Sequence, residues 1–150
     1  MVLYSIPNLN ESFSMEYSIP KIKDSIVLIP LLDKKYKIAL QDESPYRVTL
    51  ESKEFLNSAV FVDFNLDTIQ ENKTDVTLEI RRKKRSFDQY YEVTNAFIHI
   101  DNLIEQLSKA VALKEIEIQE LKENQITQEI QTNKKQKQEV LESIKRLWSF

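Results

Sequence analysis

Few side chains in this sequence can do chemistry, and the first of them is the only histidine, His99. The chain has 150 residues and contains no cysteine. This excludes thiol catalysis, disulfides and thiolate zinc sites, and one histidine excludes a zinc site built on several imidazoles. A Ser–His–Asp triad would have to use His99, yet no serine lies in a nucleophile motif. We therefore expect no catalytic residue and no metal site, with His99 an ordinary histidine in the first turns of a helix.

The absence of glycine excludes most loops that hold phosphate or a cofactor. A chain of this length carries roughly ten glycines on average, and this one carries none. P-loops, dinucleotide-binding fingerprints, EF-hand loops and nucleophile elbows all need glycine for positive φ or for close approach of the backbone. We therefore expect no cofactor and no enzymatic activity. Asparagine and aspartate are expected to form the tight turns, because they tolerate the left-handed region best after glycine.

Two charged features remain as candidates. The densest is a run of five cations that could contact an anion: Arg81, Arg82, Lys83, Lys84 and Arg85. Such cations bind phosphates of lipids or nucleic acids, but they also keep a hairpin tip solvated and block edge pairing. The net charge of −3 gives no specific signal for nucleic acid. Asp63 is a lone carboxylate in an apolar strand, and either a buried functional acid or a solvent-facing residue fits that position.

The elements that must position these residues follow from the apolar spacing, which alternates before about Thr94. Alternation predicts strands in half-buried antiparallel sheets. The segment 21–33 is ambiguous: Ile22, Ile26 and Ile29 favour a short helix that Pro30 kinks or ends, whereas the β-branched run also fits a buried strand. The predicted strands are 13–19, a hairpin of 36–40 and 46–50, then 58–66, 76–80 and a last one at 87–93.

From Asn95, a plausible N-cap, the spacing becomes helical. The apolar stripe that should pack on the sheet consists of Phe97, Ile100, Ile104, Leu107 and Val111, and Leu103 and Ala110 widen it. This pattern predicts an α+β fold, in which an antiparallel sheet of about five to six strands packs on a long C-terminal helix. We expect two domains, an α+β sheet–helix domain at 1–112 and a helical tail at 113–150.

The tail alternates between polar and apolar stretches. Residues 122–139 hold only two large apolar side chains, so they are expected to form an exposed helix, a coiled-coil arm or a helix–helix junction. An amphipathic face then returns as a possible tail interface: Val140, Leu141, Ile144, Leu147 and Trp148. Packing on a protein partner or a second copy is favoured over peripheral membrane contact. No signal peptide or apolar run of about twenty residues is evident, so we expect a cytoplasmic protein.

The order of predicted elements is similar to the small helix-grip group of the START/Bet v 1-like (SRPBCC) superfamily. The resemblance lies in residues 36–51, 59–66, 74–81 and 95–112, and it implies an apolar cavity between sheet and helix. Residues 118–129 resemble the SHOCT oligomerisation motif. If residues 26–31 instead form a strand, the chain looks like a pleckstrin-homology-type barrel.

Two functions follow from these features. The first is a non-enzymatic interaction module, in which the protruding helical tail serves self-association or partner docking. The alternative is a small lipophilic-ligand or anionic-lipid binding domain.

Overall fold

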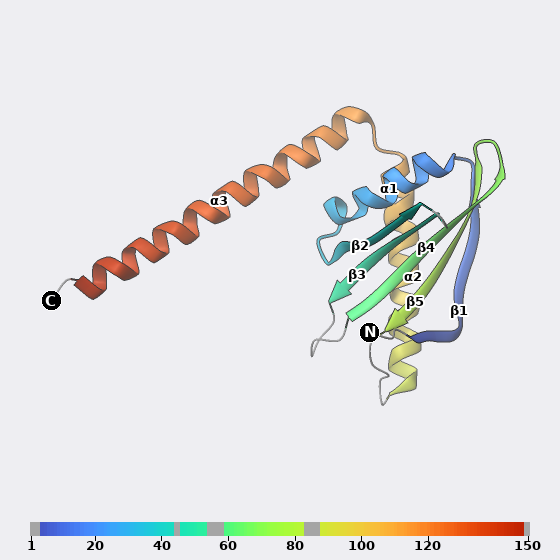
Figure 1. Cartoon of the computed structure of the whole chain (residues 1–150), viewed down its shortest axis with the longest axis horizontal. Helices are drawn as coiled ribbons and strands as arrows, with labels where there is room; N and C mark the ends of the chain where they lie inside the picture. Colours follow the sequence, from blue (N-terminus) through green and yellow to red (C-terminus); the bar gives the residue numbers. More distant parts are fainter. Residues whose placement is uncertain (1–3, 44–45, 54–58, 83–87, 149–150) are drawn as a thin grey trace. The chain divides into compact units, whose positions relative to one another are not determined.

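A computed structural model describes residues 4–43, 46–53, 59–82 and 88–148. It divides the chain into two compact units, Met1–Ala112 and Leu113–Phe150. Unit 1 contains the strands β1 (Tyr4–Met15), β2 (Tyr36–Glu43), β3 (Tyr46–Lys53), β4 (Ala59–Gln70) and β5 (Lys73–Arg82), and the helices α1 (Ile19–Leu32) and α2 (Gln89–Val111). Unit 2 contains the helix α3 (Glu115–Trp148). Figure 1 shows these elements.

The five strands of unit 1 form one antiparallel sheet with the order β1-β5-β4-β3-β2. Strands β4 and β5 extend further than the apolar alternation predicts, because polar residues continue the ladder as far as Gln70 and Lys73. The turn between them contains Asn72, whose φ is 60°. Asparagine thus takes the left-handed position that glycine would otherwise fill, as expected. The predicted α+β class is confirmed.

Residues 19–32 form a helix, so the expectation of a helix at 21–33 is confirmed and the barrel alternative is wrong. Ser18 caps it by accepting a hydrogen bond from the Lys21 amide, and Pro20 lies in the first turn. Pro30 lies inside α1, and the helix continues for two further residues to Leu32. The strand predicted at 13–19 is shifted, since β1 ends at Met15 and Ile19 already belongs to α1.

Helix α2 begins earlier than the sequence analysis expected. Asp88, not Asn95, is the N-cap, and its carboxylate accepts a hydrogen bond from the Tyr91 amide. Residues 89–93 therefore lie in a helix, and the prediction of a strand at 87–93 is wrong for them. Asp88 competes successfully as a cap because a carboxylate at a helix N-terminus also interacts favourably with the helix dipole.

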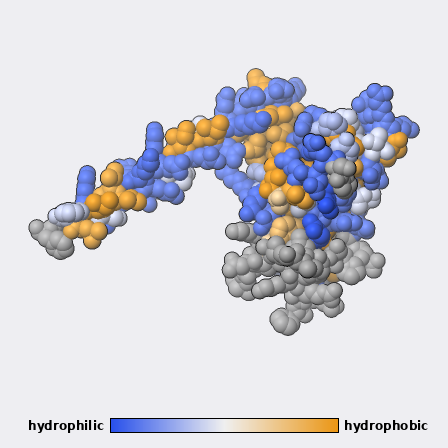
Figure 2. Space-filling model, in the orientation of Figure 1, coloured by the Kyte–Doolittle hydropathy of each residue, from blue (hydrophilic) through white to orange (hydrophobic). Residues whose placement is uncertain are grey.

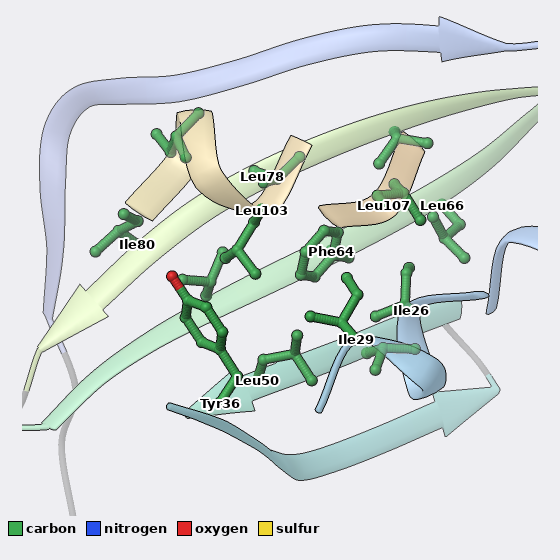
Figure 3. Packing of buried hydrophobic residues seen from close by; sticks show 14 of the residues in the cluster. Ile26, Ile29, Tyr36, Leu50, Phe64, Leu66, Leu78, Ile80, Leu103 and Leu107 are labelled. Carbon is green, nitrogen blue, oxygen red and sulfur yellow. The ribbon is translucent and has the colours of Figure 1, made fainter. Parts of the chain in front are cut away.

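The core lies between one face of the sheet and the two helices. Ile22, Ile26 and Ile29 of α1 are fully buried together with Phe64 of β4. Figure 3 shows this packing around Ile26, Ile29, Phe64 and Leu107. The α2 stripe is confirmed at Ile100 and Leu107, with Ile104 and Val111 partly buried, but Phe97 is about half exposed. Leu103 and Ala110 are buried as predicted, and Ala96 and His99, which the sequence did not assign to the stripe, also face the core.

Unit 2 is a single 34-residue helix without buried residues. The expectation of an exposed helix over 122–139 is confirmed, whereas a coiled coil stays a prediction. Its exposed apolar side chains form separate groups between polar stretches (Figure 2). Among the described residues, no helix is both long and apolar enough to cross a membrane.

Candidate functional site

The buried core face of the sheet is mostly apolar, with polar side chains near the two ends of β5. At one end Thr74 donates a hydrogen bond to the Tyr17 carbonyl, and at the other end lies a longer polar row. Strand register places Tyr36 beside Ser52, Ser52 beside Val60, and Val60 beside Arg82. All four residues are buried. We call this row, with the α2 residues packed on it, the polar end. The next row of the sheet is Ile38, Leu50, Val62 and Ile80, which contains no polar side chain.

On the β2 side, the polar end is a chain of hydrogen bonds. The Tyr36 hydroxyl lies 2.7 Å from Nδ1 of His99, and the Asn102 amide donates to that hydroxyl at 3.2 Å. Asn102 also donates to the carboxylate of Asp33 at 3.0 Å. Because a carboxylate only accepts, this contact fixes the orientation of the Asn102 amide. The Tyr36 hydroxyl therefore accepts from Asn102 and also hydrogen-bonds to His99, where either group can be the donor.

Tyr36 and His99 also touch through their rings. The ring centroids lie 5.7 Å apart in an edge-to-face arrangement, which is a favourable geometry for aromatic pairs. Nζ of Lys35 lies 5.6 Å from the centroid of the Tyr36 ring. The sequence predicts an ordinary histidine at position 99, partly buried or at the surface. In the structure His99 is only 4% exposed, and its hydrogen-bond partner Tyr36 lies 63 positions away in the sequence.

On the β5 side, the polar end holds the guanidinium of Arg82. Its Nη2 donates a hydrogen bond to Oδ1 of Asn95 in the second turn of α2. Nε of Arg82 is buried and has no hydrogen-bond partner among the described residues. Glu92, one turn before Asn95 on α2, is also buried. Asn95, predicted as a helix cap, is therefore an acceptor for a buried cation.

Arg81, the neighbour of Arg82, points to the opposite face of β5. It forms a two-pronged ion pair with Asp63, with Nε 2.5 Å from Oδ2 and Nη2 2.8 Å from Oδ1. Thr49 donates a further hydrogen bond to Oδ1 at 2.6 Å. Asp63 is thus buried, at 1% exposure, but fully engaged with partners. Arg81 and Arg82 do not share a surface, because successive residues of a strand face opposite sides of the sheet.

The remaining predicted site residues are placed as follows. Lys83, Lys84 and Arg85 lie outside the described residues, so their contact with an anion stays a prediction. The side chains of the predicted tail interface are all exposed: Val140, Leu141, Ile144, Leu147 and Trp148. Among the described residues, no group of three or more histidine, aspartate or glutamate side chains is placed to hold a metal ion.

Sequence reasoning missed Tyr36, Ser52, Asn95 and Asn102 as site residues. Tyr36 looked like the first apolar member of an alternating strand, and Ser52 like the strand's polar end. Their common position depends on strand register, which spacing within a single strand does not reveal. One signal was available in the sequence. Ser52 lies two residues after Leu50, and Arg82 lies two residues after Ile80, so strand alternation predicts that both side chains face the core.

No protein-family model and no curated protein sequence matches this chain. Similar solved structures include a conserved protein from Geobacillus kaustophilus, at 11% identity and a TM-score of 0.45, covering 69% of this chain and 93% of that one. A START superfamily protein from Mycobacterium smegmatis has 9% identity and a TM-score of 0.36, covering 68% and 92%. The ZhuI aromatase/cyclase from Streptomyces sp. R1128 has 7% identity and a TM-score of 0.37, covering 81% and 94%.

The first function predicted from the sequence, an interaction module that works through its tail, is corrected by the placement of the buried polar side chains. Among the described residues these side chains lie within unit 1, and α3 buries none. The chain has the helix-grip arrangement predicted from its sequence, in which an antiparallel sheet packs on a long helix that follows it.

Proposed function

We propose that unit 1 binds a small lipophilic ligand that carries a polar group, and that the polar end receives this group. The observation that carries the proposal is the buried polar row Tyr36, Ser52 and Arg82 beneath His99 and Asn95, beside an apolar row of the same sheet face. Ligand sites typically combine apolar walls with a few convergent polar groups. Burying such groups without a ligand role opposes folding unless each finds a partner.

We place the ligand at this end of the core because the polar side chains converge there. Ile22, Ile26 and Ile29 of α1 pack beside Phe64 in the far part of the core, and all four are at 0% exposure. Side chains at 0% exposure adjoin neither solvent nor a water-sized void, and the same holds at the polar end for Val60 and Ala96. The ligand is therefore compact, and its entry requires the first turns of α2 to move away from the polar row.

Ser52 offers the cleanest test of this site. Its side chain is buried on the polar row, and its hydroxyl makes no hydrogen bond to a described residue. Ser52→Ala should therefore leave the unfolding midpoint nearly unchanged, because no hydrogen bond to a described residue is lost. If the hydroxyl contacts the ligand's polar group, the variant should weaken binding about fivefold, the effect of one hydrogen bond.

Equilibrium dialysis of the full chain with decanol and with decanoic acid measures this binding. Both are single-chain amphiphiles that differ only in their polar group. Ser14→Ala, an exposed position on β1, is the matched control and should not change either affinity. Absence of binding for both compounds, or equal effects of the two serine variants, would contradict the proposed function. That the protein is not an enzyme, and that its tail has a protein partner, stay predictions from the sequence.

A further inference from the structure

Arg82 is buried, whereas Arg47 and Arg81 are partly exposed, and it differs from them in having no counter-ion among the described residues. Arg47 lies 3.3 Å from the carboxylate of Asp42, and Arg81 is paired with Asp63. Arg82 is only 3% exposed, yet its single described partner is the neutral amide of Asn95, and its Nε has none. A buried charge without a counter-ion opposes folding strongly. Among the residues that the structure describes, no carboxylate is paired with Arg82, although Glu92 is buried one turn before Asn95 on α2.

The surroundings of Arg82 define where an anion fits. Register places Val60 between Arg82 and Ser52, so these two side chains flank Val60 at about 10 Å from backbone to backbone. Helix α2 crosses above this row, because Asn95 bonds to Arg82 at one side and His99 bonds to Tyr36 at the other. Ala96, between these two helix positions, has the smallest side chain that α2 can present there, apart from glycine.

We propose that Arg82 anchors the carboxylate of an amphiphilic ligand, with Ser52 as a second donor on the same row. This inference rests on the proposed function and adds the chemical class of the ligand, a monocarboxylate with an apolar body. A guanidinium holds a carboxylate through two parallel hydrogen bonds, one of them from Nε, and this is the donor that Arg82 leaves unused. The adjoining row, Ile38, Leu50, Val62 and Ile80, is apolar and would contact the apolar body once α2 moves away from the sheet.

The test compares decanoate with decanol on the full chain and on two variants. Wild type should bind decanoate at least about tenfold more tightly than decanol, since a charge-assisted hydrogen bond exceeds a neutral one. Arg82→Met should abolish this preference while keeping decanol binding. Lys37→Gln removes one positive charge from an exposed position on β2, and it should leave the preference unchanged.

Thermal unfolding without ligand separates an anchor from a structural cation. Arg82→Met should unfold at the same temperature as wild type or higher, because an apolar side chain of similar length replaces an unpaired buried charge. A lower midpoint together with loss of decanol binding would show a structural role and overturn the proposal. Arg82→Lys should keep part of the preference, since it retains charge but not the two-pronged geometry.

Acetate and inorganic phosphate, each tested alone, distinguish an amphiphile from a free anion. Measurable binding of either without binding of decanoate would overturn the carboxylate-amphiphile assignment and the proposed function together. Equal affinities for decanoate and decanol in wild type would overturn the role of Arg82 but leave the proposed function standing. Binding of neither amphiphile and of neither anion would overturn both.

Discussion

Individual residues show how buried charge is accommodated differently on the two faces of one strand. Asp63 and Arg81 satisfy each other on the outer face, with Thr49 completing the carboxylate's contacts. Arg82, one residue further on, has only an amide. Strand β5 thus holds one arginine that is paired with a carboxylate, Arg81, and one that has no counter-ion among the described residues, Arg82. We infer that the first serves stability and the second recognition.

The Asp63–Arg81 pair leads to a prediction about stability. Arg81→Ala should lower the free energy of unfolding by about 2–3 kcal/mol, because it leaves a buried carboxylate without its counter-ion. Replacing both members, as Asp63→Val with Arg81→Leu, should cost less than the single change. Urea denaturation followed by circular dichroism measures both values. A larger loss for the double variant would mean that the pair itself, and not the orphaned charge, dominates.

Single elements carry much of the predictable structure. The spacing of Ile22, Ile26 and Ile29 identified α1, because a helix places these positions on one face. Alternation identified the strands β2 to β5, because one face of each is buried in the core. The start of α2 was missed, since Asp88 and Asn95 are both good caps and only tertiary context selects one. Phe97 was misplaced for a related reason: the core-facing stripe includes His99, whose burial depends on Tyr36.

The turn between β4 and β5 gives a prediction at this scale. Asn72 lies in the left-handed region at φ 60°, where a Cβ atom is unfavourable. Asn72→Gly should therefore raise the free energy of unfolding by about 0.5–1 kcal/mol, and Asn72→Ala should lower it by a similar amount. Glu71→Gly is the control, since no positive φ is found at that position, and it should not stabilise. Chemical denaturation of the three variants measures whether each one raises or lowers the free energy of unfolding. A more stable Asn72→Ala variant would contradict the argument.

The whole molecule comprises a sheet–helix unit with a complete core and a helix without buried residues. The fold class could be predicted from the sequence because it depends on periodicity. The polar end could not be predicted in this way, because its side chains come from four strands and from α2. These side chains are far apart in the sequence, between residues 36 and 99. The run Arg81–Arg85 illustrates this limit: adjacency in sequence suggested one basic patch, yet strand geometry separates its first two members.

Truncation after Ala112 tests the independence of unit 1. Because α3 buries no residue, the remaining chain should unfold within a few degrees of the full chain, the range typical of surface changes. Its affinity for decanoate should also be unchanged. Differential scanning calorimetry and dialysis measure these quantities. A drop of more than about 10 °C, or loss of binding, would mean that residues 113–150 contribute to the core or to the site.

The position of the single tryptophan has an optical consequence. Trp148 is 84% exposed at the end of α3, and the chain has no other tryptophan. Indole emission therefore reports on the tail alone, and the folding of the sheet–helix core is silent when the protein is excited at the red edge of its absorbance. The tyrosines are the chromophores of unit 1, and Tyr36, held edge-to-face against an imidazole, is the one whose near-ultraviolet signal should respond when a ligand arrives.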